Sequence, residues 1–152
     1  MISQKAKYAL RALVALARAP HGEPVLISDI AEDQSIPKKF LEQILLDLKH
    51  HGIVMSRRGR AGGYQLLKDP AEITFGQVLR IVDGPIAPLP CLSKIAYRRC
   101  EDCISETDCE VRRVFAEVTD ATRQVLDNAT IAEAIAASSD GEGRLRDLAA
   151  VE

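Results

Sequence analysis

The segment that most restricts the fold of this chain is a basic, glycine-rich stretch between two short apolar runs. The runs are residues 53–55 and 64–67, and the stretch between them carries Arg57, Arg58 and Arg60 among three glycines. Short apolar runs around a glycine cluster are typical of a β-hairpin, because glycine adopts turn conformations that other residues resist. Three arginines at one tip repel one another unless an anion lies nearby. The sequence therefore predicts a two-stranded hairpin whose tip contacts an anionic partner.

Three helices are predicted before the hairpin. Ser3 can cap the first, whose apolar residues recur at helical spacing until Pro20-His21-Gly22 ends it. A short second helix leads into a tight turn at 34–36, and Pro37 suits the first position of a third helix. Two helices joined by such a turn make a helix-turn-helix. With the hairpin as its wing, residues 1–84 are predicted to form a winged helix-turn-helix, a DNA-binding fold.

The third helix has one apolar and one polar face. Its apolar residues between positions 40 and 48 share one face, which leaves lysine, glutamate and glutamine on the other. Such a polar face alone is common on a solvated helix. The wing strengthens the interpretation, because arginines on a glycine-rich hairpin enter a narrow minor groove or bind phosphates. The residues predicted to contact DNA are Lys38, Lys39, Glu42, Gln43, Arg57, Arg58 and Arg60.

The charge distribution agrees with a polyanion-binding module joined to a separate assembly module. Residues 1–70 carry eleven Lys and Arg against seven Asp and Glu, a net charge of +4. Residues 71–152 carry nine against fifteen, a net charge of −6. The first half is therefore basic and the second acidic, although the whole chain has a net charge of only −2.

All four cysteines lie within nineteen residues, at Cys91, Cys100, Cys103 and Cys109. Cysteines used as small core residues would be spread along the chain, so this cluster indicates a local site that needs sulfur. Arg98 and Arg99 lie beside Cys100 in the sequence, and Cys109 falls in the predicted first turn of a helix. A neighbouring cation and a helix N-terminus both favour the thiolate, which is the form that binds metals.

The spacing of the cysteines leaves the bound group open. Only Cys100-x2-Cys103 is a common chelating pair, and the full pattern matches neither the paired knuckles of zinc sites nor a ferredoxin run. We expect a cytoplasmic protein, because residues 1–19 do not resemble a signal peptide and no apolar run is long enough to span a membrane. Clustered thiols in that compartment more often bind metal or do redox chemistry than form structural disulfides. We favour an iron-sulfur cluster over zinc, a thiol-disulfide switch or chance clustering.

A long helix is predicted after the cysteines. The capping box Thr107-x-x-Glu110 starts it, and it reaches about Asn128. About twenty residues give roughly 30 Å of helix, which a domain of this size does not cover without a partner. We therefore expect a dimer interface rather than an intramolecular core. The residues predicted to form it, at the three-four spacing of a coiled-coil seam or beside it, are Val111, Val114, Phe115, Val118, Ala121 and Val125.

The chain is thus expected to be mainly α-helical, with a small β-hairpin wing and a long dimerisation helix. Residues 1–84 form the DNA-binding domain, and 85–109 form a cysteine-rich loop that binds a cluster. Residues 107–137 form the dimerisation helix and a short last helix, capped by the box Thr130-x-x-Glu133. Residues 138–152 are a tail rich in Ser, Asp, Gly and Glu that is expected to be mobile.

Four pieces of the sequence resemble the Rrf2 family of bacterial winged-helix repressors, to which the iron-sulfur regulators IscR, NsrR and RirA belong. They are Tyr8-Ala-Leu-Arg-Ala-Leu in the first helix, Phe40-Leu-Glu-Gln-Ile-Leu in the third, Arg58-Gly-Arg-Ala-Gly-Gly-Tyr64 in the wing, and the cysteine loop before a long helix. The resemblance covers about residues 2–135. It implies a homodimer on double-stranded DNA at a palindromic operator, with the third helix in the major groove. It further implies that Glu42, Lys38 and Lys39 meet base edges or adjacent phosphates, and that Arg58 enters the minor groove.

The resemblance also implies a set of cluster ligands, from which this chain departs. Cluster-binding members of the family typically carry three cysteines with five residues between the last two, which fits Cys103 and Cys109 with Cys91 as the first. The fourth ligand in relatives can be a histidine three residues later or an aspartate from the partner's first helix. Those positions hold Arg112 and Lys7 here, and neither side chain ligates iron. Cys100 is then the replacement, which implies an all-cysteine site within one subunit.

The predicted function is that of a DNA-binding transcription regulator, a repressor, whose operator affinity is controlled by an iron-sulfur cluster of 2Fe-2S or 4Fe-4S type. The cluster would set the angle between the dimerisation helix and the winged helix, and so the spacing of the two recognition helices on DNA. The alternatives are a zinc-bound or thiol-disulfide-switched repressor of the same fold, and a cluster-assembly adaptor without a promoter target. We expect no enzyme, no membrane partner and no small-molecule substrate, because no nucleophile stands in a recognisable catalytic arrangement.

Overall fold

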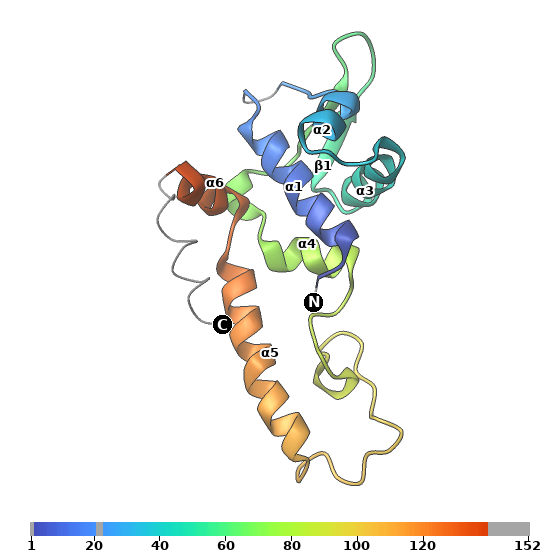
Figure 1. The fold of residues 1–152 in the computed structure, drawn as a ribbon, viewed down its shortest axis with the longest axis vertical. Coiled ribbons are helices and arrows are strands. Elements are labelled where there is room, and N and C mark those ends of the chain that lie inside the picture. Colours follow the sequence, from blue (N-terminus) through green and yellow to red (C-terminus); the bar gives the residue numbers. More distant parts are fainter. Residues whose placement is uncertain (1, 21–22, 140–152) are drawn as a thin grey trace.

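The computed structural model describes residues 2–20 and 23–139. Residues 21–22, within the predicted end of the first helix, and 140–152, within the predicted tail, lie outside the described residues. The fold class is confirmed, since helices dominate and the only sheet of the described part is a two-stranded hairpin (Figure 1). The elements are α1 (Gln4–Arg18), α2 (Ile27–Asp33), α3 (Lys38–His50), β1 (Val54–Arg57), β2 (Gly63–Leu66), the 3-10 turn η1 (Pro70–Glu72), α4 (Phe75–Val82), the 3-10 turn η2 (Pro90–Leu92), α5 (Glu110–Asn128) and α6 (Ile131–Ser139).

Helix α1 forms the centre of the winged-helix body. Ser3 caps it as predicted, because its hydroxyl oxygen accepts a hydrogen bond from the backbone N–H of Ala6 at 3.0 Å. Three of its buried residues are alanines, whose small side chains let α3, α4 and α6 pack closely around it. Val14 and Ala17, two further apolar residues of this helix, are only partly buried. The buried residues of α1 are Ala6, Ala9, Leu10, Ala12, Leu13 and Leu16.

The turn between α2 and α3 fixes the position of α3. Ser35 adopts a positive φ of 50°, which reverses the chain within two residues. Arg11 of α1 donates a hydrogen bond to the carbonyl oxygen of Gln34 at 2.5 Å and so ties this turn to the core. Pro37 is the N-cap rather than the first helical residue, so α3 begins one residue later than predicted. The face of α3 toward the core consists of Leu41, Ile44, Leu45 and Leu48, all fully buried.

The wing is a hairpin whose base joins a third segment of chain. Its antiparallel register runs from the pair Val54 and Leu66 to the pair Arg57 and Gly63, so the strands extend into the stretch predicted as turn. Val25, before α2, exchanges two backbone hydrogen bonds of 2.8 Å with Tyr64 of β2. Gly63 has a φ of 147°, and a Cβ there would collide with the carbonyl of Val25. Only glycine therefore allows the wing to pass this close to the segment before α2.

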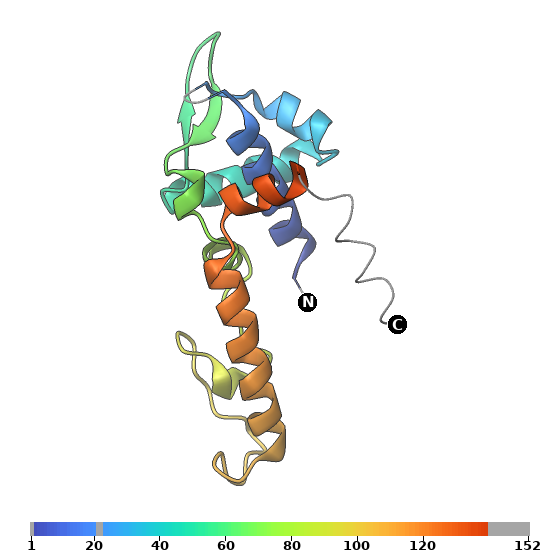
Figure 2. The same cartoon turned by 90° about the vertical axis from the view of Figure 1, so that its left-hand side faces the viewer.

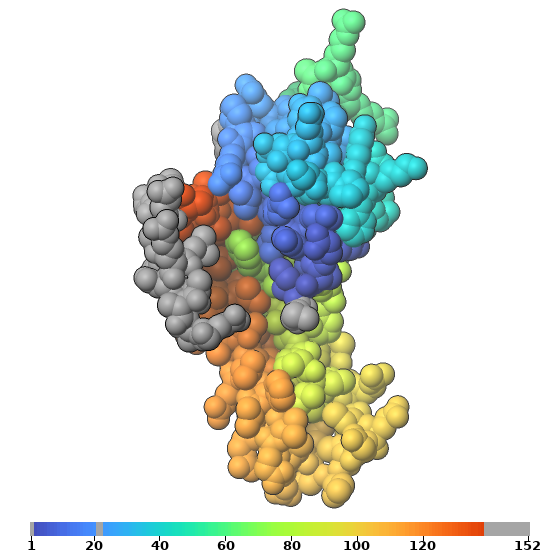
Figure 3. Space-filling model, in the orientation of Figure 1, coloured from blue at the N-terminus to red at the C-terminus, as the bar shows by residue number. Residues whose placement is uncertain are grey.

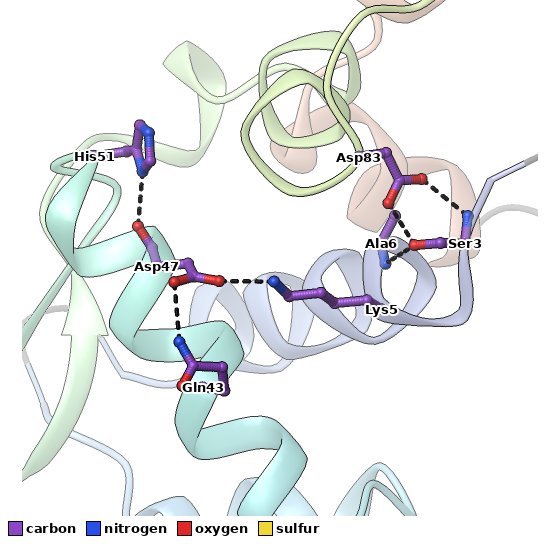
Figure 4. A network of polar contacts seen from close by, with 7 residues as sticks. All are labelled: Ser3, Lys5, Ala6, Gln43, Asp47, His51 and Asp83. Carbon is purple, nitrogen blue, oxygen red and sulfur yellow. Dashed lines mark hydrogen bonds and ion pairs between the residues drawn. The ribbon is translucent and has the colours of Figure 1, made fainter.

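Polar contacts fasten α1 to α3 at one point and to the end of α4 at another (Figure 4). The ammonium group of Lys5 donates to the carboxylate of Asp47 at 2.7 Å, and both side chains are about 30% exposed (31% and 28%). Ser3 donates through its backbone N–H to Asp83 at 2.8 Å, and its hydroxyl donates to the same carboxylate. The hydrogen bond from Lys5 is the main cause that lowers the pKa of Asp47 below its ordinary value.

Replacing Asp47 with asparagine is expected to lower the free energy of unfolding at pH 7 by about 0.2–1 kcal/mol, the range for a solvent-accessible ion pair. Because the folded state lowers the pKa of this carboxyl, its stabilisation is present above the unfolded pKa of about 3.9 and is lost as the pH falls through the folded pKa. Urea unfolding at pH 7 and pH 3 measures both values. The difference between wild type and D47N should shrink at pH 3, and the Lys5→Met variant should lose the effect of D47N. Equal stability of D47N and wild type at pH 7 would contradict this prediction.

Helix α5 extends away from the winged-helix body, and α6 returns to that body (Figures 1 and 2). Where the chain returns, the segment before α4 pairs with the segment after α5. The backbone N–H of Phe75 donates to the carbonyl of Ala129, and that of Ile131 donates to the carbonyl of Ile73, both at 2.9 Å. Thr130 and Glu133 form the predicted capping box of α6. Ile131 is fully buried. The C-terminal end of α5 is therefore joined to the winged-helix body by main-chain hydrogen bonds.

A side-chain pair strengthens the same junction. Arg80 of α4 donates two hydrogen bonds, of 2.6 and 2.8 Å, to the carboxylate of Asp127 in α5, and this contact lowers the pKa of Asp127 below its usual range. Gly76 lies beneath the pair, where a Cβ would collide with the Asp127 carboxylate. The bidentate geometry and the close approach at Gly76 fix α5 relative to α4.

Candidate functional site

The polar face of α3 is exposed, as the sequence predicts. Lys38, Lys39 and Glu42 point away from the core, while Gln43 donates a hydrogen bond to the carboxylate of Asp47 at 3.1 Å. Phe40, predicted to belong to the apolar stripe, is instead 37% exposed and packs edge-on against Tyr8. The face therefore presents two lysines, a glutamate and a glutamine that is held in place from within its own helix. Their contact with DNA stays a prediction.

The wing arginines lie at the far end of the molecule from the cysteine loop. Arg57, Arg58 and Arg60 are exposed, and the hairpin tip projects beyond the rest of the surface (Figure 3). Among the described residues none of these guanidinium groups has a hydrogen-bond or ion-pair partner. The turn itself is closed by a hydrogen bond of 3.0 Å from the N–H of Gly62 to the carbonyl of Gly59. Three unpartnered cations on a closed turn can bind phosphates without breaking an internal contact.

The four cysteines line one pocket of about 550 Å³, between the loop 85–109 and the N-terminal end of α5. All four are free thiols, and Cys91 is buried while the other three are half-buried. The sequence separates the first from the last by eighteen positions, so the fold gathers them. No set of three or more His, Cys, Asp or Glu side chains within the described ranges is arranged to hold a metal ion. The thiols thus surround a common space without converging on one point.

The N-cap of α5 differs from the prediction. The helix begins at Glu110 with Cys109 as its N-cap, and the sulfur of Cys109 accepts a hydrogen bond of 3.3 Å from the backbone N–H of Arg112. The prediction that a capping box at Thr107 and Glu110 starts this helix is therefore wrong. The hydroxyl of Thr107 instead contacts Ser105 and Asp108 in a local polar turn. The sulfur of Cys109 therefore takes the place at the N-terminal end of α5 that a hydroxyl or carboxylate oxygen usually takes at an N-cap.

The arginines of the loop act on a different cysteine from the one predicted. Arg99 donates to the carbonyl of Cys103 at 3.1 Å and interacts with the thiol of Cys103, which raises the pKa of Arg99. Cys100 has a raised pKa, caused first by burial and then by its contact with Cys91. The expectation that Arg98 and Arg99 favour a thiolate at Cys100 is therefore wrong. The thiol of Cys100 interacts with that of Cys91 instead.

Two contacts hold the loop in place, one within the loop and one between the loop and α5. Tyr97 donates to the carboxylate of Glu106 at 2.6 Å and so closes the loop upon itself, a contact that also raises the pKa of Tyr97. Arg123, in the second turn from the end of α5, donates to the carbonyl of Leu92 in η2 at 2.8 Å. Neither contact is evident from the sequence, because each joins residues without a recognisable motif. Arg112 was likewise identified only as a residue that cannot ligate iron, yet it lines the cysteine pocket.

The predicted seam of α5 is exposed in the single chain. Its large apolar residues are between 39% and 66% exposed, and Thr119 is the only buried residue of α5. An apolar stripe of this length on a soluble protein indicates an interaction surface. The exposed seam residues are Val111, Val114, Phe115, Val118, Ala121 and Val125.

The structure combines a helix-turn-helix and a basic wing with a cysteine-lined pocket and an exposed apolar helix. These features define a winged-helix protein of the DNA-binding class. Residues 2–137 match the model of the Rrf2 family, described as an iron-dependent transcriptional regulator. The chain belongs to the Rrf2 family of transcription regulators, which is not a family of enzymes. No helix in the described part is both long enough and apolar enough to cross a bilayer.

Several relatives cover nearly the whole chain. An rrf2-like HTH-type transcriptional regulator of Rhodobacter capsulatus is 47% identical over 150 residues, which are 97% of this chain and 100% of that protein. CymR, the global cysteine regulator of Bacillus subtilis, is 33% identical over 142 residues, or 93% of each chain. The structure of CymR has a TM-score of 0.75, covers 90% of this chain and 96% of its own, and is 30% identical. The structure of IscR from T. potens has a TM-score of 0.68 at 27% identity and covers 95% and 90%.

Proposed function

We propose that this transcription regulator is a repressor that binds a palindromic operator as a homodimer, and that an iron-sulfur cluster in the loop 85–109 controls its affinity for the operator. The observation that carries the proposal is the pocket of about 550 Å³ that all four cysteines line at the start of α5. The similarity to IscR and the description of the family as iron-dependent support the same assignment.

The residues that line the pocket suit such a group chemically. Cys91, Cys100, Cys103 and Cys109 are the ligands that we assign, because four thiolates are the usual ligand set of 2Fe-2S and 4Fe-4S clusters. The bound cluster would supply sensitivity to redox state and to iron supply. The chain's own part is to hold the sulfur atoms near one space, which Arg99, Tyr97 and Arg123 do through their hydrogen bonds.

The three functional parts of the chain are arranged so that the loop can influence DNA binding. We assign residues 1–84 to DNA binding, 85–109 to the sensor and 107–137 to dimerisation, with the helix itself starting at Glu110. The sensor adjoins one end of α5, while the other end is fixed to the winged helix through Arg80 and Asp127. A change in the loop therefore acts on the helix that sets the distance between two DNA-binding bodies.

On DNA, we assign α3 to the major groove and the wing to the minor groove. The exposed residues Lys38, Lys39, Glu42 and Gln43 project from one side of α3, as a recognition helix requires. Arg58 lies at the hairpin tip with no internal partner among the described residues, which suits insertion into a narrow groove. Arg57 and Arg60 flank it and are assigned to phosphates.

A thiol-disulfide switch is the second candidate, because Cys91 and Cys100 are free thiols that line one pocket and interact with each other. The similarity to CymR, a cysteine regulator, gives this candidate further weight. A repressor with zinc on the same four thiols and a cluster-assembly adaptor without a promoter target complete the alternatives. Each differs from the cluster-controlled repressor in the metal, the sulfide content or the DNA footprint of the purified protein.

Protein purified without exposure to air is expected to be brown, with visible absorption from sulfur-to-iron charge transfer and with iron and acid-labile sulfide in equal amounts. The Cys100→Ser variant should lose at least most of this absorption, because one of four ligands is removed. The matched control is Ser105→Ala, which changes a hydroxyl that lines the same pocket and is assigned no ligand role. Colourless protein with stoichiometric zinc, or with a Cys91–Cys100 disulfide and no iron, would overturn the cluster assignment. The lack of any specific footprint would favour the adaptor.

A further inference from the structure

We propose that Arg112 supplies the positive charge and the N–H donor that stabilise the metal-thiolate group in the cysteine pocket. The inference rests on the proposed function, because it concerns the group that the four cysteines bind. It assigns a tuning role to a residue that contacts the sulfur ligands rather than the metal.

The position of Arg112 directs its side chain toward the cysteines. Arg112 lies two helical turns before Thr119, the one buried residue of α5, and therefore on the face of α5 that packs toward the loop. It lines the cysteine pocket and also a neighbouring pocket of about 270 Å³. Cys91 is the only other residue that lines both. The side chain thus passes beside Cys91, between the two spaces.

The guanidinium group of Arg112 has an unused donor at this place. Its Nε is buried and has no hydrogen-bond partner in the part of the chain that the structure describes. A buried N–H without an acceptor is rare in folded proteins and indicates a bound group or water that completes it. The backbone N–H of the same residue already donates to the sulfur of Cys109. One donor of Arg112 therefore contacts a sulfur ligand, and its side chain lines the pocket that the four thiols share.

The charges around the pocket explain why a cation beside the thiols would stabilise a bound metal group. Besides the four thiols, the lining includes the carboxylates of Asp102, Asp108 and Glu110. Arg112 is the only cationic side chain among the described residues that line it. Four thiolates carry more negative charge than a divalent metal or a 2+ cluster core neutralises, so the loaded site is anionic. A single fixed cation at its edge opposes that excess and stabilises the bound group.

Two consequences can be measured. A positive charge and an N–H donor near the sulfur ligands favour the more negative, reduced state of a cluster and so raise its reduction potential. The same interactions slow the loss of the metal, and the removal of a residue that supports the ligands typically weakens metal binding by about tenfold or more. The Arg112→Met variant keeps the length of the side chain but lacks both the charge and the donor.

The test compares wild type with the R112M, R112K and Arg113→Met variants. Arg113 is exposed on the same turn of α5, so R113M controls for the loss of one positive charge from the chain. One arm measures the reduction potential of the anaerobically purified proteins and the rate of iron loss to a chelator. The other arm titrates Co²⁺ into reduced, iron-free protein and follows the sulfur-to-cobalt absorption. Far-UV circular dichroism establishes that each variant is folded.

R112M is expected to lower the reduction potential, to lose iron about tenfold faster and to bind Co²⁺ about tenfold more weakly, whereas R113M should match wild type. R112K should fall between them, because it keeps the charge and loses the planar donor.

If wild type carries a cluster and R112M equals it in potential, iron loss and Co²⁺ affinity, the role of Arg112 is overturned while the proposed function stands. If wild type carries no cluster, the proposed function fails, and the Co²⁺ arm alone decides whether Arg112 supports a thiolate metal site. An R113M protein as impaired as R112M, or a wild type that binds neither group, also overturns the role.

Discussion

Replacing Val118 with aspartate is expected to convert the proposed homodimer into monomers and to remove operator binding at concentrations where wild type binds fully. Val118 lies at the middle of the exposed seam of α5, with 48% of its surface accessible in the single chain. In a two-fold dimer the substitution introduces two like charges into one apolar interface, so each must be desolvated near the other. We expect the dimer dissociation constant to rise by about a hundredfold or more, roughly 3 kcal/mol.

Analytical ultracentrifugation measures the oligomeric state, and fluorescence anisotropy with an operator duplex measures the affinity. The matched control is Gln124→Glu, which adds a single negative charge to an exposed position of the same helix outside the seam. It should remain a dimer. A V118D protein that is still dimeric at micromolar concentration would show that the seam is not the interface, and the assignment of α5 to dimerisation would have to be abandoned.

The second large effect is expected from Arg58→Ala in the wing. Removing one arginine from each half-site should weaken operator binding by about 1–3 kcal/mol per subunit and reduce the dependence of log K on log salt by roughly two per dimer. Because no described residue partners this guanidinium, the substitution breaks no internal contact and should leave the free energy of unfolding unchanged.

Titration of a palindromic operator at several salt concentrations measures both quantities. Lys68→Ala is the control, since Lys68 is an exposed cation just after β2 and away from the hairpin tip. It should change the slope far less. A slope for R58A equal to that of wild type would mean that the tip does not neutralise phosphates, and the assignment of the wing to DNA would then lack support.

Much of the fold follows from patterns within a few residues of one another. Ser3 and Thr130 cap their helices as predicted, because a hydroxyl followed three residues later by a free backbone N–H needs no long-range information. The seam of α5 was also predictable, since residues at three-four spacing share one face of any helix. Thr107 shows the limit of such reasoning. Its hydroxyl is used by Ser105 and Asp108, so the sulfur of Cys109 becomes the cap.

The parts that the sequence did not predict depend on distant contacts. The pairing of Phe75 with Ala129 joins segments more than fifty residues apart, and no local motif indicates it. The charge environment of the cysteines was misjudged for a similar reason. Arg99 is adjacent to Cys100 in the sequence, but the loop folds so that its guanidinium reaches Cys103. Neighbouring position in a loop is therefore a poor guide to which thiol a cation affects.

Because Arg80 and Asp127 hold α5 and the winged-helix body together, a rotation of this unit about the junction, its pivot, also displaces the distant cysteine end of α5. With nineteen residues the helix is about 28 Å long, so a rotation of roughly 5° at the pivot moves the cysteine end by about 2.5 Å. A displacement of that size is close to the length of a single iron-sulfur bond, about 2.3 Å by analogy with zinc-sulfur. In the proposed homodimer, a rearrangement of the four sulfur atoms around a cluster would therefore correspond to a rotation of each winged-helix body by a few degrees. The two half-sites that these bodies would bind lie about 34 Å apart.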